Sequence, residues 1–250
     1  MLLWLLAPGG VALAARVLPT ESPRWSAKLA RIVAADQAKP PPTGGVVFAG
    51  SSSIERWPAL ADTFPGATVL NRGVGGSWLS DFADHVDQLV LACEPRTVVL
   101  YAGENDIAAG FAPADVLAAF NEFRARLRAA APRARLIFLA LKPCPRRAKL
   151  IPAMQEANAL IAAECRKDPD CTFIDTFSPL LDAEGKPSPE LYAADGVHLS
   201  KAGYRVWNDL LLPVLKPVAT RNDSVTPSAL KPTVPRPLPV KTTRAEARES

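Results

Sequence analysis

Apolar runs typical of buried strands alternate with helical segments along this chain of 250 residues, and this alternation constrains the fold most. Short runs rich in Val, Ile and Phe predict strands, whereas apolar residues spaced three and four apart predict helices. Two parallel neighbouring strands need a crossover connection, so the alternation favours a parallel sheet covered by helices. Strands are expected at residues 46–49, 67–70, 97–102, 136–141 and 171–175.

The segments between these runs show the spacing of amphipathic helices. In residues 113–131, apolar side chains recur so that they share one face of a helix. We therefore predict a three-layer α/β/α sandwich with a five-stranded parallel sheet. Helices are expected at residues 21–35, 79–93, 113–131, 151–165 and 201–214, with a helical turn in residues 54–62 that is broken at Pro58.

Composition changes on both sides of a central domain, which we place at residues 21–216. Residues 1–20 are mostly apolar and contain a small-x-small motif, typical of a cleavage site, at 12–14. They lack the positively charged N-terminal region of a signal peptide, and a Pro-Gly-Gly sequence at 8–10 interrupts the apolar run. They predict a signal peptide or membrane anchor, and so an exported protein, with a cytoplasmic one as the alternative. Residues 217–250 are rich in Pro and poor in aromatic residues, which predicts a disordered tail.

Charge and cysteine usage exclude several classes of function. The net charge is +4, and no basic stripe with interleaved aromatics occurs, so nucleic acid binding is not expected. The four cysteines match neither a zinc spacing nor a Cys-x-x-Cys redox motif, and we expect no metal and no cofactor. In an exported protein Cys165 and Cys171 could close a small disulfide loop. Buried thiols are the alternative for all four cysteines, Cys93, Cys144, Cys165 and Cys171.

Polar and glycine-rich blocks follow the predicted strands at their carboxyl ends, where open α/β sheets place ligands. They are Gly50–Ser53 after the first strand, residues 71–77 after the second, residues 103–106 after the third, and residues 195–200 before the last helix. Each block alone also fits a plain structural element: a turn, a loop or a helix N-cap beside a passing histidine.

The order of the four blocks resembles the SGNH hydrolases, also called the GDSL esterase/lipase family, over residues 46–212. Gly-x-Asn-Asp followed by Asp-x-x-His carries most of the resemblance. It implies the flavodoxin-like SGNH hydrolase fold and a metal-independent serine hydrolase. It further implies that Ser52 is the nucleophile, His198 the base and Asp195 its orienting partner. The oxyanion hole would comprise the N–H groups of Ser52 and Gly76 and the side-chain amide of Asn105.

The chemistry needs the same residue types. A serine hydroxyl becomes a useful nucleophile when an adjacent imidazole takes its proton, and a nearby carboxylate orients that imidazole. The family usually has Asp before the nucleophile, where this chain has Ser51. Three serines are therefore consecutive, and the choice of Ser52 rests on the family alignment. Asp106 is expected to support the Asn105 loop, and His85 to be structural or solvated.

We therefore predict a serine esterase that acts on short-chain, lysophospholipid or acetyl esters through an acyl-enzyme. The alternatives are a carbohydrate O-deacetylase or O-acyltransferase with the same triad, or a catalytically silent binding module. The expected partners are small-molecule, lipid or carbohydrate esters, with membrane association through the N-terminal segment. Trp78 and Trp57 could each line the substrate pocket or pack in the core, and we favour the core for Trp57.

Overall fold

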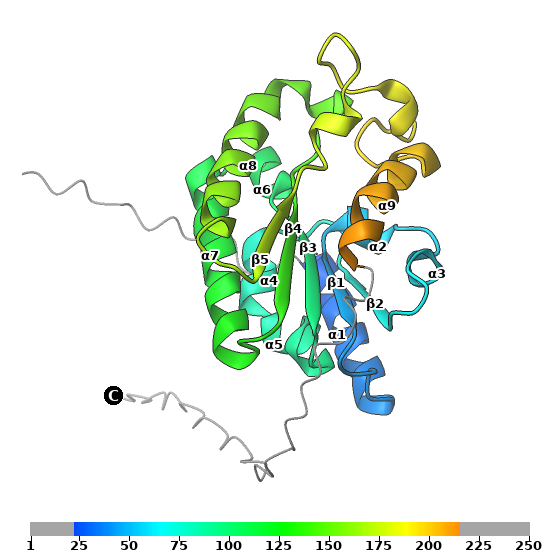
Figure 1. The fold of residues 1–250 in the computed structure, drawn as a ribbon, viewed down its shortest axis with the longest axis vertical. Helices are drawn as coiled ribbons and strands as arrows, with labels where there is room; N and C mark the ends of the chain where they lie inside the picture. The colour runs from blue at the N-terminus through cyan, green and yellow to red at the C-terminus, as the bar shows by residue number, and fades with distance from the viewer. Residues whose placement is uncertain (1–22, 216–250) are drawn as a thin grey trace, which may run out of the picture. The chain divides into compact units, whose positions relative to one another are not determined.

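The computed structural model describes residues 23–215 (Figure 1). The predicted signal or anchor in residues 1–20 and the predicted tail in residues 217–250 lie outside the described residues. Within the described part of the chain, no helix is long and apolar enough to cross a membrane.

Five parallel strands form one sheet in the order β2-β1-β3-β4-β5 (Figure 1). The predicted parallel sheet is confirmed. The strands are β1 (Val46–Gly50), β2 (Val69–Gly73), β3 (Thr97–Tyr101), β4 (Arg135–Leu139) and β5 (Cys171–Ile174). Residues 71–73, predicted as loop, belong to β2 because Asn71, Arg72 and Gly73 pair in register with the last three residues of β1.

Helices cover both faces of the sheet (Figure 1). On one face lie α4 (Leu79–Asp84), α5 (Val86–Leu89), α7 (Pro113–Ala130) and α8 (Ile151–Cys165), and on the other lies α9 (Lys201–Leu215). The apolar side of α7 is buried as its spacing predicts. The remaining helices are α1 (Pro23–Ala38), α2 (Ser52–Glu55), α3 (Leu60–Thr63) and α6 (Glu104–Ala108), with 3₁₀ turns at Leu91–Cys93, Pro145–Leu150, Ser178–Leu180 and Pro189–Leu191.

The single helix predicted over residues 79–93 is wrong. The backbone leaves the helical region at His85 (φ −112°, ψ 23°), so α4, α5 and a 3₁₀ turn replace one helix. The ring of His85 packs edge to face against Trp25, with ring centroids 4.9 Å apart. Phe82 and Val86 are buried on either side of the break. Apolar spacing therefore persists although the helical backbone is interrupted.

Candidate active site

The sharp turn from β1 into α2 presents Ser52 at the carboxyl edge of the sheet. Gly50 makes this turn possible, because its φ of +154° is rare for other residues and a Cβ there would lie 2.1 Å from the carbonyl oxygen of Tyr101. Ser51 and Ser53 are buried, at 3% and 1% exposure, whereas Ser52 is partly exposed. The tertiary structure thus distinguishes Ser52 from its two neighbours.

Side chains from β2 and α9 hold α2, which is only one turn long. The amide of Asn71 donates to the carbonyl of Ile54 at 2.8 Å, and its oxygen accepts the N–H of Gly73. The hydroxyl of Tyr204 on α9 donates to the carbonyl of Ser53 at 2.9 Å. The segment that carries Ser52 is therefore fixed to the helix that follows the Asp195–His198 loop.

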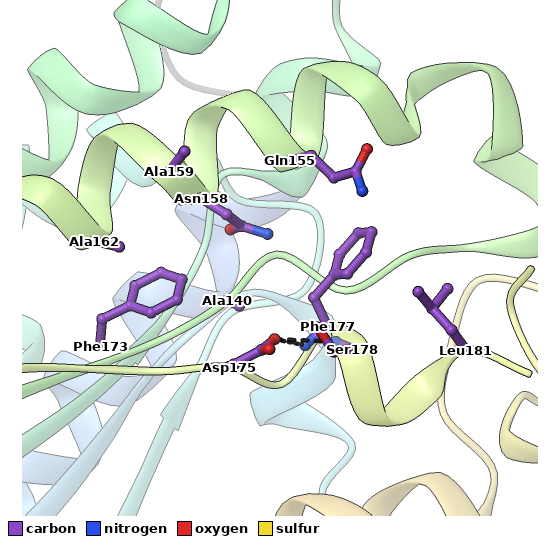
Figure 2. A pocket seen from close by; sticks show the side chains of 10 residues that line it. All are labelled: Ala140, Gln155, Asn158, Ala159, Ala162, Phe173, Asp175, Phe177, Ser178 and Leu181. Carbon is purple, nitrogen blue, oxygen red and sulfur yellow. Dashed lines mark hydrogen bonds between the residues drawn. The ribbon is translucent and has the colours of Figure 1, made fainter. Parts of the chain in front are cut away.

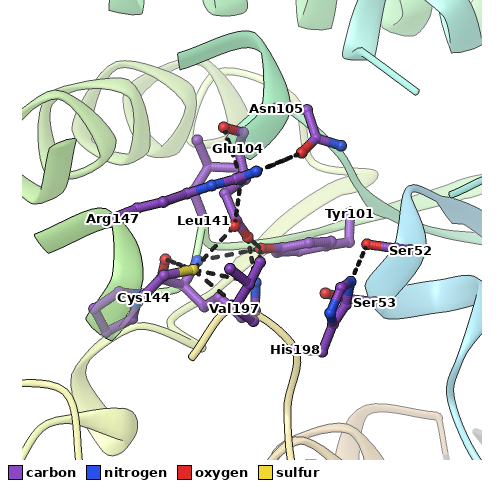
Figure 3. Close-up of polar contacts among 12 residues, drawn as sticks. Ser52, Ser53, Tyr101, Glu104, Asn105, Leu141, Cys144, Arg147, Val197 and His198 are labelled. Atoms are coloured by element: carbon purple, nitrogen blue, oxygen red, sulfur yellow. Dashed lines mark hydrogen bonds and ion pairs between the residues drawn. The ribbon is translucent and has the colours of Figure 1, made fainter. Parts of the chain in front are cut away.

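His198 lies between Ser52 and Asp195, as Figure 3 shows for its contact with the serine. The Nε2 of His198 is 2.9 Å from the Oγ of Ser52, and its Nδ1 is 2.6 Å from the Oδ2 of Asp195. The other carboxylate oxygen accepts the backbone N–H groups of Val197 and His198, each at 2.9 Å. In this arrangement Nδ1–H donates to the carboxylate, which leaves Nε2 to accept the serine proton.

The Asp195 carboxylate is stabilised in its ionised form. Burial raises its pKa, but the hydrogen bonds from the imidazole and backbone of His198 and from the backbone of Val197 outweigh burial and hold the pKa well below its ordinary value. An ionised carboxylate beside Nδ1 is what an imidazole needs when it takes a proton from serine.

Arg56 is a further neighbour of His198 and Asp195, and it was not predicted from the sequence. Its NH1 lies 3.2 Å from Nδ1 of His198 and 4.0 Å from Oδ2 of Asp195. A guanidinium has donors only, and Nδ1–H already donates to Asp195, so the favourable partner of Arg56 is the carboxylate. No sequence motif signals this residue, because the contact depends on α2 meeting a loop that is distant in sequence.

The structure constrains each of the three predicted oxyanion donors, Ser52, Gly76 and Asn105, in a different way. Ser52 is the first residue of α2, so its N–H lies outside the internal hydrogen bonding of the helix. Gly76 has a φ of +88°, a backbone conformation that favours glycine. The Nδ2 of Asn105 donates to the carbonyl of Ser77 at 3.1 Å, which joins Asn105 to the residue after Gly76. Asp106 supports this region through the N–H of Leu79, as expected of it.

A buried polar cluster, also not predicted from the sequence, contacts the side-chain oxygen of Asn105 through Arg147 (Figure 3). Glu104 is 3% exposed and forms ion pairs with Lys142 and Arg147. Burial raises the pKa of Glu104, but these two cations outweigh it and lower the pKa below its ordinary value. The available signal was weak: Lys142 directly follows the apolar run at residues 136–141, and Glu104 is the variable residue of Gly-x-Asn-Asp.

The two tryptophans considered for the pocket differ in position. Trp57 is 4% exposed, packs between Phe48 and Trp207 and donates its Nε1–H to Asn208 at 3.0 Å, so it belongs to the core as favoured. Trp78 is half-buried and packs edge to face against Phe111, with ring centroids 5.2 Å apart. Trp78 follows the glycine loop and remains a candidate pocket wall.

A hollow of about 310 Å³ lies elsewhere on the molecule, between α8, β5 and the segment after β5 (Figure 2). Asp175 lies at its wall, but its carboxylate accepts the N–H groups of Phe177 and Ser178. Ser52, His198 and Asp195 do not line it, and β3 and β4 separate β5 from β1 in the sheet. The hollow is thus distinct from the site at β1.

Comparison with known proteins agrees with the fold and with the family that the sequence resembles. A family model described as the GDSL-like Lipase/Acylhydrolase family matches residues 21–206. No curated protein matches the chain. A GDSL-like lipase from Bacteroides thetaiotaomicron has a similar structure, with 23% identity, 76% of this chain and 97% of that chain covered, and a TM-score of 0.65.

Two further solved structures share the fold. A proposed acylhydrolase from Bacteroides fragilis is 24% identical, with 76% and 96% of the two chains covered and a TM-score of 0.66. An acetylxylan esterase from Geobacillus stearothermophilus, solved as a catalytic mutant, is 15% identical, with 70% and 95% covered and a TM-score of 0.58.

The family model covers well over half of the chain and includes all four blocks from Gly50–Ser53 to residues 195–200. The fold that surrounds these blocks is the one seen in the similar solved structures. The chain therefore belongs to the GDSL-like lipase/acylhydrolase family, the SGNH hydrolases, and is an ester-hydrolysing enzyme.

Proposed function

We propose that this enzyme hydrolyses carboxylic esters through an acyl-enzyme formed on Ser52, with His198 as the base and Asp195 as its orienting carboxylate. The observation that carries the proposal is the continuous contact from Ser52 Oγ to His198 Nε2 at 2.9 Å and from His198 Nδ1 to Asp195 at 2.6 Å. Nucleophile, base and orienting group are within hydrogen-bond reach of one another, as this chemistry requires.

In the first half of the reaction, Ser52 Oγ attacks the ester carbonyl carbon while Nε2 of His198 takes its proton. The negative charge that develops on the carbonyl oxygen is bound by the N–H groups of Ser52 and Gly76 and by Nδ2 of Asn105. The tetrahedral intermediate then collapses: the bond to the alkoxy group breaks, and the alcohol leaves with the proton from His198. The acyl group remains on Ser52.

In the second half, His198 takes a proton from water, whose oxygen attacks the acyl carbon through a second tetrahedral intermediate. Collapse of this intermediate breaks the bond to Ser52 Oγ, which recovers its proton from His198, and the carboxylic acid leaves. Asp195 stays ionised throughout and stabilises the imidazolium that forms in each half.

The substrates that we propose are short-chain, lysophospholipid or acetyl esters. A carbohydrate O-deacetylase is the second candidate, because the half-buried rings of Trp78 and Phe111 follow the glycine loop and α6, and aromatic faces suit the apolar faces of sugars. The similar acetylxylan esterase from Geobacillus stearothermophilus is consistent with this candidate. Relative turnover of acetylated xylo-oligosaccharides and of aryl acetates separates the two.

The test of the mechanism compares Ser52→Ala with Ser51→Ala and Ser53→Ala in the hydrolysis of p-nitrophenyl acetate, butyrate and octanoate. We expect Ser52→Ala to lose at least about 10³-fold in kcat, while each neighbouring variant retains most of it. A fluorophosphonate probe, read by intact mass and peptide mapping, should label Ser52 in the wild type. Labelling of Ser51 or Ser53, or full turnover by Ser52→Ala, would overturn the assignment. Absence of both labelling and turnover would favour the silent binding module.

A further inference from the structure

The side-chain amide of Asn105 is useful to an oxyanion in only one of its two orientations. The NH₂ group can donate to an oxyanion, whereas the carbonyl oxygen would repel it. The two orientations have almost the same shape, so packing alone distinguishes them poorly. The hydrogen-bond partners around Asn105 therefore decide whether this side chain assists or hinders the reaction.

Arg147 favours the productive orientation from the oxygen side of the amide, and the carbonyl of Ser77 favours the same orientation from the nitrogen side. Its NH1 and NH2 both lie 3.2 Å from Oδ1 of Asn105 (Figure 3). Because a guanidinium carries donors only, it can face the oxygen of the amide but not the NH₂ group. On the other side of the amide, Nδ2 donates one hydrogen to the carbonyl of Ser77 at 3.1 Å. The second Nδ2 hydrogen then remains for a further acceptor.

Arg147 is itself anchored by a buried carboxylate. Its NH1 is 2.7 Å from Oε1 of Glu104. Glu104 also binds Lys142, accepts the hydroxyl of Tyr101 at 2.5 Å and accepts the thiol of Cys144 at 2.9 Å. A carboxylate with this many partners has little freedom to move. The guanidinium that faces Asn105 is therefore held in a defined place.

The cluster carries one more positive charge than negative charge. Lys142 and Arg147 are cationic and share the single carboxylate of Glu104. Burial raises the pKa of Cys144 to about 12, so its thiol stays neutral near pH 7. The surplus positive charge lies against Oδ1 of Asn105, where it polarises the amide and makes its N–H groups stronger donors.

We infer that Arg147 is a positioning residue for ester hydrolysis: it holds the Asn105 amide with Nδ2 toward the oxyanion and strengthens Nδ2 as a donor. This inference rests on the proposed function, in which Asn105 binds the oxyanion. Arg147 acts through Asn105 and need not touch the substrate. Its loss should therefore slow the chemical step rather than weaken ground-state binding of the ester.

The first experiment measures kcat and KM of Arg147→Gln and Arg147→Lys on p-nitrophenyl butyrate. Lys149→Gln is the matched control, since it removes one exposed cation from the same 3₁₀ turn. We expect kcat to fall about 10-fold in Arg147→Gln with KM nearly unchanged, less than the loss of a whole oxyanion donor. Arg147→Lys should fold like the wild type and still lose kcat, because an ammonium cannot supply the planar two-nitrogen contact. The control should match the wild type.

The second experiment tests whether Arg147 acts through Asn105. In a double-mutant cycle, Arg147→Gln should cost about 10-fold in the wild-type background and almost nothing in the Asn105→Ala background. The affinity for an alkylboronic acid, which forms a tetrahedral adduct on serine, should fall in parallel with kcat. Equal costs in the two backgrounds, or an unchanged kcat in Arg147→Gln, would overturn the inference.

Failure of the inference can be distinguished from failure of the proposed function. Full activity of Ser52→Ala would overturn the serine mechanism itself. Loss of activity in Ser52→Ala with full activity of Asn105→Ala would keep the nucleophile but overturn the roles of Asn105 and Arg147 together. Thermal unfolding of each variant identifies any loss of folding, and in that case the cycle is read from Arg147→Lys.

Discussion

The carboxylate of Asp106 accepts the backbone N–H of Leu79, which lies 3.1 and 3.2 Å from its two oxygens. This contact joins α6, which carries Asn105, to the first residue of α4, which follows the glycine loop. The two segments that carry the predicted oxyanion donors Gly76 and Asn105 are thus linked by one buried side chain.

The first prediction concerns Asp106 and the pH dependence of stability. Burial raises its pKa to about 7, although the N–H of Leu79 acts in the opposite direction. Between about pH 4 and 7 the folded protein therefore binds a proton that the unfolded chain does not, so this group favours folding less as pH rises. Asp106→Asn keeps an acceptor oxygen and removes the titration. Its stability relative to the wild type should rise across that range and level off above it.

Urea unfolding at several pH values measures this difference, with Asp175→Asn as the control. Burial raises the pKa of Asp175, but hydrogen bonds from Ser178 and Phe177 outweigh it and lower the pKa below its ordinary value. Its contribution is therefore present above the unfolded pKa and is lost only as pH falls below it. The control should differ from the wild type by a constant amount over the same range. A flat difference for Asp106→Asn would contradict the prediction.

The second prediction concerns the buried pair of Glu104 and Lys142, which are 3% and 1% exposed. Glu104→Gln removes the carboxylate and leaves Lys142 as a buried unpaired cation, so we expect a loss of about 3–5 kcal/mol in the free energy of unfolding. The double variant Glu104→Gln/Lys142→Met should recover much of this loss, because it removes the cation as well. The exposed Glu184→Gln should be nearly neutral. Chemical denaturation checks all three, and no recovery in the double variant would argue against an unpaired charge as the cause.

The third prediction separates the two tryptophans. Trp57→Ala empties a buried site among Phe48, Phe64 and Trp207 and should lower the free energy of unfolding by about 3–5 kcal/mol. Trp78→Ala removes a half-buried ring and should cost much less stability. If Trp78 lines the substrate pocket, this variant should change the relative kcat/KM for acetyl, butyryl and octanoyl esters. If the relative kcat/KM for the three esters is unchanged, Trp78 has a purely structural role.

The fourth prediction concerns Cys165 and Cys171. Both are buried free thiols, and their sulfur atoms lie 2.7 Å apart across the turn from α8 to β5. Oxidised glutathione should convert the pair to a disulfide, with two equivalents of reduced glutathione released. Closure of so short a loop should stabilise the protein by about 2 kcal/mol. Peptide mapping with and without reductant, with Cys165→Ser as the control, checks the bond. A mixed disulfide that never resolves would contradict the prediction.

Local sequence was sufficient to predict the layered α/β architecture. The run at Val46–Gly50 is apolar up to its final glycine, and the run at Thr97–Tyr101 is apolar after its first residue. Such continuous apolar runs are expected of strands buried on both faces. Helical spacing in Pro113–Ala130 likewise identified the side that packs against the sheet. These signals are local because they arise from the two periods at which side chains leave strand and helix backbones. The limits of β2 and the break at His85 were not predicted, because they depend on strand pairing and tertiary packing.

The sequence by itself determined the parallel sheet, the order of the four blocks and the residue types that serine chemistry needs. The choice of Ser52 among three consecutive serines came from the resemblance to the family, and the tertiary structure brings the Oγ of this serine to His198. Only the tertiary structure decided that Arg56 lies beside Asp195 and that Glu104, Lys142 and Arg147 form one cluster next to Asn105. The physical reason is that hydrogen bonds and ion pairs depend on distances of a few ångströms between side chains. Those distances follow from the sheet order and from turns that bring residues up to 151 positions apart into contact, and no local pattern in the chain encodes them.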